Sequence, residues 1–396
     1  MKLFKLTVII SFSLLFLTGC WDRAELSEVS IVTGVAIDKG KTKKYRLTIE
    51  TTEAREMNYQ TATGMAPSFV YSLEGDAVGE IAHKFNISNA SRLVYSHMRL
   101  LAISQEVAET GTMDFMDFFD RNREMRDDFS IVIVRGQDAG SLLEVTNMYK
   151  KSPSLKIFTQ LNTMQKEWGG APDIKLNDFV RLYNAQGQSP VLAAARLIGD
   201  PKKGGNVENL KSEVPESSVV IDSIGVIKNG KLVGFATLKE VRDMLFIQGR
   251  IKNTELTVKC IKGDKKFGYR ITSTKTKVTA KEKNGIPTFH VKIKAEGYLE
   301  STGCTNEFKK ESAFEGQEKA INKMMEDEIM RFINKSREEY NADIFGFGEF
   351  LREQDYKHFK KYGVQWDQGF AKADINITFA AEVKRTGLRS NPYMMK

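Results

Sequence analysis

Cysteine, histidine and proline are scarce in this chain of 396 residues, and their scarcity excludes several classes of protein. Three cysteines are too few for a disulfide-dense scaffold or a cysteine-rich metal module. Four scattered histidines do not form a multi-histidine metal site, and eight prolines leave no long proline-rich linker. The G-x-S-x-G, H-E-x-x-H and G-x-x-x-x-G-K-[ST] motifs are also absent. We therefore expect no metal, no cofactor and no enzymatic activity.

Long hydrophobic runs are lacking as well. No stretch reaches 18 consecutive apolar residues, whereas a membrane-spanning helix needs about 20. The longest run, residues 6–17 (LTVIISFSLLFL), follows Lys2 and Lys5. A positive start before a short apolar core is typical of a secretory signal peptide.

The signal segment ends in Leu17-Thr18-Gly19-Cys20, which resembles a bacterial lipobox at all four positions. This pattern predicts that residues 1–19 are removed and that Cys20 becomes the first residue. Its thiol would then carry a diacylglycerol thioether, and its amine an N-acyl chain. Each buried methylene contributes about 0.8 kcal/mol, so two or more chains give a stable anchor. The alternative is an ordinary secretory signal with a chance cysteine.

The rest of the chain contains 41% apolar and 28% charged residues, which is enough apolar material for real cores. Its length predicts two to four domains. Residues 200–217 (DPKKGGNVENLKSEVPES) have paired glycines, two prolines and no apolar periodicity. We interpret them as a linker between an N-terminal region, 20–199, which could contain two subdomains, and a C-terminal domain, 218–396.

Both regions mix strand and helix patterns without a clean βαβ alternation in the second, so the predicted fold class is α+β. The N-terminal region shows strand patterns at 28–38, 44–52, 92–104 and 129–135, and helical patterns at 76–86, 105–126, 138–148, 153–167 and 176–186. Residues 190–199 fit either type. The C-terminal domain has a hairpin at 221–237, where Asn229-Gly230 marks the turn. We expect its other strands at 254–261, 267–278, 288–299, 303–309 and 374–385, and its helices at 238–247, 311–340 and 346–361.

The positive charge is unevenly distributed. The net charge is +8 over the whole chain, −3 over residues 20–217 and +9 over residues 218–396. Nucleic acid is an improbable partner for an exported protein. An anionic membrane surface or an acidic partner is more plausible, and a merely solvated basic face is the alternative.

Two small groups of residues are candidates for chemistry. Asp114, Asp117 and Asp120 share one helical face, where a solvated surface is a better interpretation than a cation site. Cys260 and Cys304 are both predicted in strands, so a cross-strand disulfide is geometrically feasible. Of the two alternatives, we favour a pair of free buried thiols.

The chain as a whole resembles the Ger(x)C family, the C-subunit lipoproteins of spore nutrient germinant receptors. The resemblance starts at the lipobox and Cys20-Trp21-Asp22-Arg23-Ala24-Glu25-Leu26 and continues through Gly34-Val35-Ala36-Ile37-Asp38. It includes Ser96-His97-Met98-Arg99, residues 117–121 and 131–134, the hairpin at 225–234 and Arg385-Thr386-Gly387-Leu388. It also includes Asn341-Ala342-Asp343-Ile344-Phe345-Gly346-Phe347-Gly348.

The resemblance implies an elongated protein of several mixed sheet-and-helix domains, without enzymatic activity. It implies a place on the outer face of the spore inner membrane, with integral membrane subunits of the receptor as partners. The lipid bilayer is a further partner, through acylated Cys20 and the basic C-terminal domain. Such a subunit would act by protein–protein contact in germination.

A second hypothesis is a substrate-binding lipoprotein that captures a small nutrient itself. Such proteins usually have two α/β lobes around a cleft, which the C-terminal strand meander and long helix fit poorly. A third, an envelope hydrolase, needs a nucleophile or paired carboxylates that the sequence does not reveal.

Overall fold

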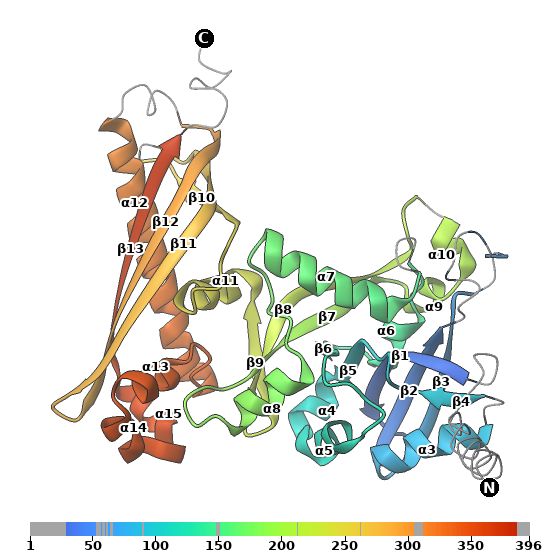
Figure 1. Cartoon of the computed structure of the whole chain (residues 1–396). Helices are drawn as coiled ribbons and strands as arrows, with labels where there is room; N and C mark the ends of the chain where they lie inside the picture. The colour runs from blue at the N-terminus through green and yellow to red at the C-terminus, as the bar shows by residue number, and fades with distance from the viewer. Residues whose placement is uncertain are drawn as a thin grey trace, which may run out of the picture.

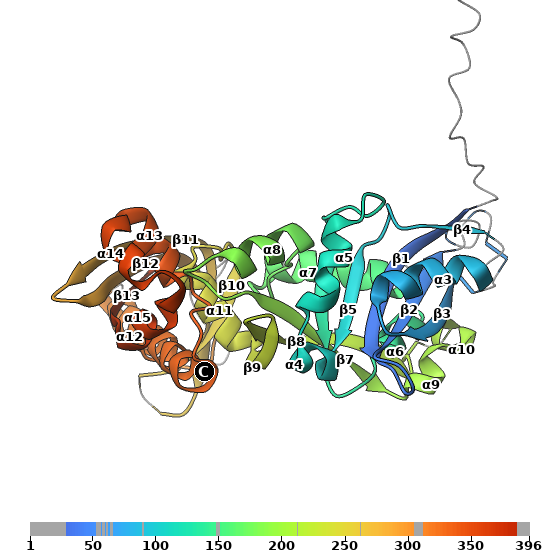
Figure 2. The same cartoon turned by 90° about the horizontal axis from the view of Figure 1, so that it is seen from below.

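The computed structural model describes residues 29–385, except 53–56, 58–59, 61, 64–65, 89–90, 148–150, 212, 262 and 305–311. The signal segment 1–19 and Cys20 therefore lie outside the described residues. The described chain folds into two mixed sheets packed with helices, arranged as an elongated body (Figures 1 and 2). The predicted α+β class and elongated shape are confirmed.

The first sheet has nine strands in the order β3-β2-β1-β5-β6-β7-β8-β9, with β4 paired to the start of β1. Its centre, β1-β5-β6-β7, is parallel, and antiparallel strands flank it on both sides. The strands are β1 (Val29–Lys39), β2 (Tyr45–Thr52), β3 (Ser68–Gly75), β4 (Arg92–Val94), β5 (Leu100–Ser104), β6 (Ser130–Val134), β7 (Val191–Gly199), β8 (Ser217–Lys228) and β9 (Lys231–Thr237).

Helices cover both faces of this sheet, as a parallel centre requires. Alternate residues of each strand go to opposite faces, so Val35 and Leu101 enter one core while Ala36 and Ala102 enter the other. The first core is closed by α3 (Val78–Ser88), α4 (Gln105–Thr110), α5 (Met113–Arg121) and α8 (Leu176–Asn184). The second is closed by α6 (Gly140–Glu144) and α7 (Pro153–Glu167).

The second sheet has the order β10-β11-β12-β13 and is built around one long hairpin. Its strands are β10 (Thr254–Lys259), β11 (Lys266–Lys283), β12 (Ile286–Thr302) and β13 (Asp374–Arg385). Its helical elements are α11 (Leu238–Ile247), α12 (Ser312–Lys335), α13 (Phe347–Gln354), α14 (Tyr356–Tyr362), α15 (Trp366–Lys372), the π-helical turn Ser336–Tyr340 and the 3₁₀ turn Gly363–Gln365. The buried side chains of this part join the α6–α7 core of the first sheet, so one continuous core links the two sheets.

Several elements differ from the sequence predictions. The ambiguous residues 190–199 form a strand, β7, and β3 was not predicted at all. The helix expected at 105–126 breaks at Gly111, whose φ of 138° does not fit a helix. The helix expected at 346–361 breaks at Asp355, and α15 follows without having been predicted.

The predicted linker, residues 200–217, does not separate the two sheets. It contains the short helices α9 (Pro201–Gly204) and α10 (Val207–Lys211) and connects β7 to β8, which are neighbours in the first sheet. The hairpin β8–β9 completes that sheet although it follows the predicted boundary. The sequence could not show this pairing, because alternating apolar residues indicate that a hairpin has a buried face but not which sheet it joins.

A buried carboxylate lies where α11 meets α12. Asp243 is only 2% exposed, and its Oδ1 atom has no hydrogen-bond partner among the described residues. Burial raises the pKa of Asp243 from its ordinary value near 3.8 to about 7, with Arg242 opposing and Glu328 adding to the rise. The native state therefore favours the protonated form of this side chain.

This raised pKa predicts a specific pH dependence of stability. The native state keeps a proton on Asp243 that the unfolded chain releases near pH 4. The stabilisation that this bound proton gives the native state is therefore fully present below about pH 4 and is lost as the pH rises through about 7. Asp243→Asn keeps the shape without the charge. A shift of one pKa unit corresponds to about 1.4 kcal/mol. The free energy of unfolding of Asp243→Asn minus that of the parent protein should therefore be roughly 2–4 kcal/mol larger at pH 8 than at pH 5.

Thermal and urea unfolding at the two pH values measure this difference. Asp120→Asn, at an exposed position, is the control and should leave the pH profile unchanged. An identical pH profile for Asp243→Asn and the parent protein would contradict the assignment.

Candidate functional site

A buried loop, residues 341–346, joins the turn at Ser336–Tyr340 to α13. Asp343 lies in this loop, 1% exposed, and its carboxylate accepts four hydrogen bonds. Three come from the backbone N–H groups of Phe345, Gly346 and Gly348, at 3.0, 2.9 and 2.9 Å, and one from Trp366 Nε1 at 2.8 Å. One side chain therefore fixes the loop, the start of α13 and the start of α15.

The electrostatics of Asp343 combine two opposing effects. Burial raises the pKa of its carboxyl to about 6, and the four N–H donors limit that rise because they stabilise the charged form. At neutral pH the group is a buried anion with its lone pairs engaged. Asn341 and Gly346 have φ of 48° and 87°, a conformation that asparagine and glycine adopt with least strain.

The same loop is bonded to the segment before β7 in the first sheet and to the C-terminal end of α11. Ser189 N–H donates to the carbonyl of Asp343 at 2.7 Å. The side-chain amides of Gln188 and Gln248 both donate to the carbonyl of Ile344, at 3.3 and 3.2 Å. We call this set of contacts, between residues 341–348 and residues 186–190, 228 and 248, the junction.

A lysine and two glycines complete the junction. Lys228, in β8, donates to the carbonyl of Asn341 and forms an ion pair with Asp367 at 2.9 Å. Gly187 and Gly348 lie against each other: a Cβ on Gly348 would come within 2.4 Å of Gly187 Cα. A side chain at either position would separate the two parts, so the junction depends on close backbone contact.

A pocket of about 360 Å³ opens beside the junction, between α8 and α13. It contains charges of both signs, and some of them already pair with each other, as in Arg181–Asp178 at 3.5 Å. Its charged lining residues are Asp178, Arg181, Arg250, Glu349 and Glu353. Within the described ranges, no cluster of three or more His, Cys, Asp or Glu side chains is suited to hold a metal ion.

Of the three aspartates on one face of α5, Asp114 and Asp117 line a second pocket, of about 640 Å³, between β2, α3 and α5. Asp114 pairs with Lys44 at 2.6 Å, and Asp117 pairs with Arg121 at 2.6 Å. Asp120 lies exposed on the next turn. Two of the three carboxylates are therefore neutralised by lysine or arginine, and the structure agrees with a solvated, ion-paired face.

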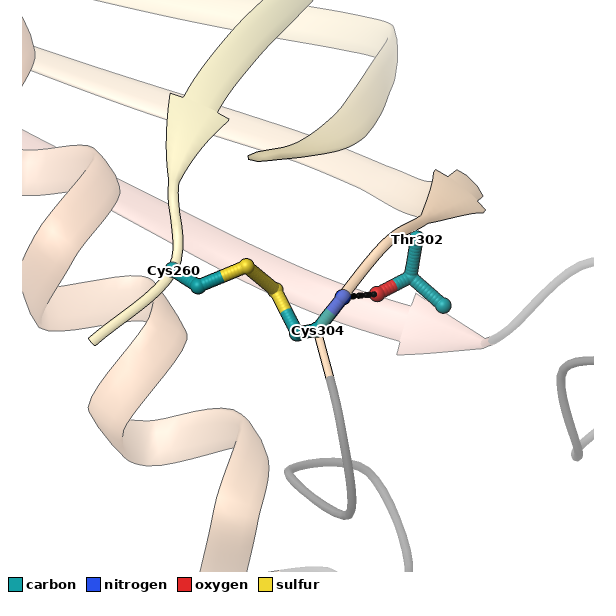
Figure 3. Close-up of a disulfide and its surroundings, with 3 residues drawn as sticks. All are labelled: Cys260, Thr302 and Cys304. Atoms are coloured by element: carbon teal, nitrogen blue, oxygen red, sulfur yellow. Dashed lines mark hydrogen bonds between the residues drawn. A yellow bond between two sulfur atoms is a disulfide. The ribbon is translucent and has the colours of Figure 1, made fainter. Parts of the chain in front are cut away.

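Cys260 and Cys304 are joined by a disulfide in the structure (Figure 3). The expectation of free thiols is therefore corrected. β10 ends at Lys259 and β12 at Thr302, so both cysteines lie just beyond strand ends at the same end of the sheet. Most of the strand expected at 303–309 lies outside the described residues. β10 and β12 flank β11 there, which brings the two Cα atoms to 5.7 Å, within the range of a disulfide.

The residues of the junction were not predicted from the sequence. Asp343 lies inside a segment that carries the family resemblance, but a single aspartate before Gly-Phe-Gly does not show that it is buried. Gln188 and Ser189 carry no signal that could have been found. Cys20, the one residue with an expected chemical role, lies outside the described part of the chain.

Comparison with known proteins matches both parts of the chain. A family model described as "Spore germination protein N-terminal domain" covers residues 22–197, and one described as "Spore germination B3/ GerAC like, C-terminal" covers residues 222–387. "Spore germination protein KC" of Bacillus subtilis (strain 168) is 27% identical over 394 residues, which are 98% of this chain and 97% of the relative. "Spore germination protein B3" of the same organism is 25% identical over 386 residues, 95% of this chain and 96% of the relative.

A solved structure shows the same fold. The crystal structure of the GerBC protein superposes with a TM-score of 0.57 at 19% identity, covering 89% of this chain and 97% of that one. The two family models together span both sheets and the junction between them. The chain belongs to the GerAC-like family of spore germination proteins.

Proposed function

We propose that this chain is a membrane-anchored lipoprotein subunit of a nutrient germinant receptor, acting by protein–protein contact in spore germination. The observation that carries the proposal is the match, almost end to end, to relatives named as spore germination proteins. The partners would be the integral membrane subunits of the receptor. The proposal assigns no catalytic residue and no cofactor to this chain.

The proposed anchor is the acylated thiol of Cys20. Eight residues separate it from β1, so about 30 Å of extended chain at most would join the lipid to the first sheet. Among the described residues, no helix is long and apolar enough to cross a membrane. In this proposal, the lipid on Cys20 holds the body on the outer face of the spore inner membrane.

The disulfide supports a location outside the cytoplasm. Disulfides persist in oxidising surroundings and are rare where thiols are kept reduced. Cys260 and Cys304 are 6% and 3% exposed, which shields the bond from solvent reductants. Export by a signal segment and a bonded cysteine pair are consistent with each other.

In the proposed mechanism, the body acts as one stiff element between its contacts. The junction and the continuous core link the two sheets, so a displacement at one end would be passed to the other rather than absorbed by a hinge. Such a body suits a subunit that couples nutrient binding in its membrane partners to their response.

Direct capture of a nutrient is the second candidate function, and the pocket beside the junction is the observation that favours it. Arg250 and Glu353 would offer opposite charges to a zwitterion such as an amino acid. Calorimetry of the chain from Trp21 onward with amino acids and sugars decides between the two. The leading proposal expects no micromolar binding; micromolar binding that Arg250→Ala abolishes would favour capture.

Deletion of the gene tests the germination role. Spores that lack this chain and any paralogous subunit should lose their response to at least one nutrient, and the wild-type gene should restore it. A Cys20→Ala variant should appear in the soluble fraction and fail to restore the response, because no thiol remains to be acylated. Ser27→Ala, which keeps the thiol, is its control. Normal germination of the deleted spores in every nutrient would refute the proposal.

The junction predicts a second effect on function. Asp343→Ala leaves four buried N–H donors without their acceptor, so it should lower the free energy of unfolding by roughly 3–5 kcal/mol. Hydrogen exchange should quicken at residues 341–348 and 186–190 before it does elsewhere. Germination should be impaired at temperatures where the variant remains folded.

The control is Asp367→Ala, which removes only the partly exposed ion pair with Lys228. Its effect should be about 1 kcal/mol or less, because solvent screens that pair. Equal exchange rates at the junction in the two variants would contradict the role given to Asp343.

A further inference from the structure

The outer face of the second sheet carries an unusual arrangement of charge. α11, α12 and α13 pack against the inner face, where residues such as Val278 and Ile293 point. The residues between them point away from the helices, because side chains alternate along a strand. Lys275 and Lys277 of β11, and Lys292 and Lys294 of β12, all lie exposed on this outer face. We call these four side chains the lysine face.

The register places lysine directly opposite lysine. Lys275 pairs with Lys294, and Lys277 pairs with Lys292, in consecutive rows of the same face. Opposite Cβ atoms in an antiparallel pair are about 5 Å apart, and like charges in that position are destabilising. None of the four forms an ion pair with another residue in the described part of the chain. The fold tolerates an uncompensated cluster of four positive charges here.

The surroundings do not neutralise the cluster. On β13, the neighbours of Lys292 and Lys294 are Thr378 and Ala380, which are uncharged. The next row on the same face holds Glu296 beside Glu382; Glu296 is paired with Lys384 at 2.5 Å, and Glu382 is the one carboxylate there with no ion pair among the described residues. The lysine face is therefore a positive surface about two strands wide, bordered by a single acidic row.

We propose that the lysine face binds the anionic headgroups of the membrane to which the chain is anchored. The inference rests on the proposed lipid anchor, which would place the face near a bilayer. A membrane fits this face better than a protein does, because the cores of protein interfaces are enriched in arginine and aromatic residues and depleted in lysine. The three rows that hold the lysine face and the Thr279–His290 pair contain no arginine and no Phe, Tyr or Trp.

Lysine chemistry also suits phosphate headgroups that are mobile. An ammonium group is a point charge on a flexible stem, whereas arginine is suited to fixed, bidentate recognition of one carboxylate or phosphate. Each lysine held near an anionic surface strengthens binding by about fivefold at physiological salt. Four lysines acting together would bind an anionic membrane without a specific pocket for one headgroup.

The lysine face lies at the opposite end of the body from the strand that follows the proposed anchor. Figures 1 and 2 show β1, which follows the proposed anchor, and the second sheet at opposite ends of the body. Attachment at both ends would lay the long axis along the membrane instead of letting the body stand away from it. The junction would then be held at a fixed height, where membrane subunits can contact it.

Vesicle sedimentation of the chain from Trp21 onward tests the proposal without depending on the lipid. This protein should bind vesicles of phosphatidylglycerol mixed with phosphatidylcholine, bind phosphatidylcholine alone far less, and be released at about 0.5 M salt. The variant K275Q/K277Q/K292Q/K294Q should bind the anionic vesicles on the order of a hundredfold more weakly. It should unfold at the same or a higher temperature, because like-charge pairs have been removed.

The control variant K41Q/K166Q/K202Q/K211Q removes four exposed lysines from the part of the chain before β8, so its net charge is the same as that of the test variant. It should keep most of the vesicle binding. Equal losses in the two variants, or equal binding to neutral and anionic vesicles, would overturn the proposal. So would retention on immobilised polyglutamate without binding to anionic vesicles at the same salt, which would indicate an acidic protein instead. Because the anchor is missing throughout, these results are independent of the germination experiment.

Discussion

The arrangement of the two sheets depends on one buried carboxylate. Asp343 has exchanged its water shell for four N–H donors, and hydrogen bonds to a charged acceptor are roughly twice as strong as neutral ones. The donors come from the loop, from the start of α13 and from Trp366 of α15. Phe345, Phe347 and Phe370 pack around them with ring centroids 5.7–6.3 Å apart. Because the loop is rigid, its outward carbonyls meet Gln188 and Gln248 at fixed positions.

The edges of the second sheet are closed by a related use of polar side chains. Glu318, Asn322 and Glu326 of α12 accept hydrogen bonds from the N–H groups of Val383, Ala381 and Phe379, at 2.8, 2.7 and 2.9 Å. Four residues of a helix advance about 6.0 Å and two residues of a strand about 6.6 Å. Because these distances are nearly equal, every fourth residue of α12 meets every second N–H group of β13 in three successive contacts. Gln354 and Asp355 do the same for Ala280 and Glu282 on β11. The edge of β13 and the part of β11 beyond β10 are therefore closed to pairing with another strand.

Local signals in the sequence predicted local structure well. Asn229-Gly230 forms the expected hairpin turn, and Asn284-Gly285 forms a second one, with positive φ at all four residues. At the N-terminus of α11, the side chains of Thr237 and Glu240 form a reciprocal capping box. Non-local facts were missed for a consistent reason. The sheet that β8 and β9 join, the meeting of Cys260 with Cys304 and the burial of Asp343 all depend on distant segments. The candidate pocket lies between α8 and α13, which are separated by more than 160 residues.

The fold decides which of the surplus lysines in the C-terminal part are paired with acidic residues and which are not. Several C-terminal lysines are already paired, as in Lys239–Glu328 at 2.6 Å and Lys335–Glu240 at 2.9 Å, whereas the lysine face is not. A slip of one residue in the β11–β12 hairpin would turn its four lysines into the core, so the buried residues between them fix their direction. The fold does not, however, require lysine: in the adjacent rows, Ser273 and Thr279 occupy equivalent outward positions on β11 without charge. Since four lysines raise the energy of the isolated sheet, the reason for their presence has to lie in what the face meets.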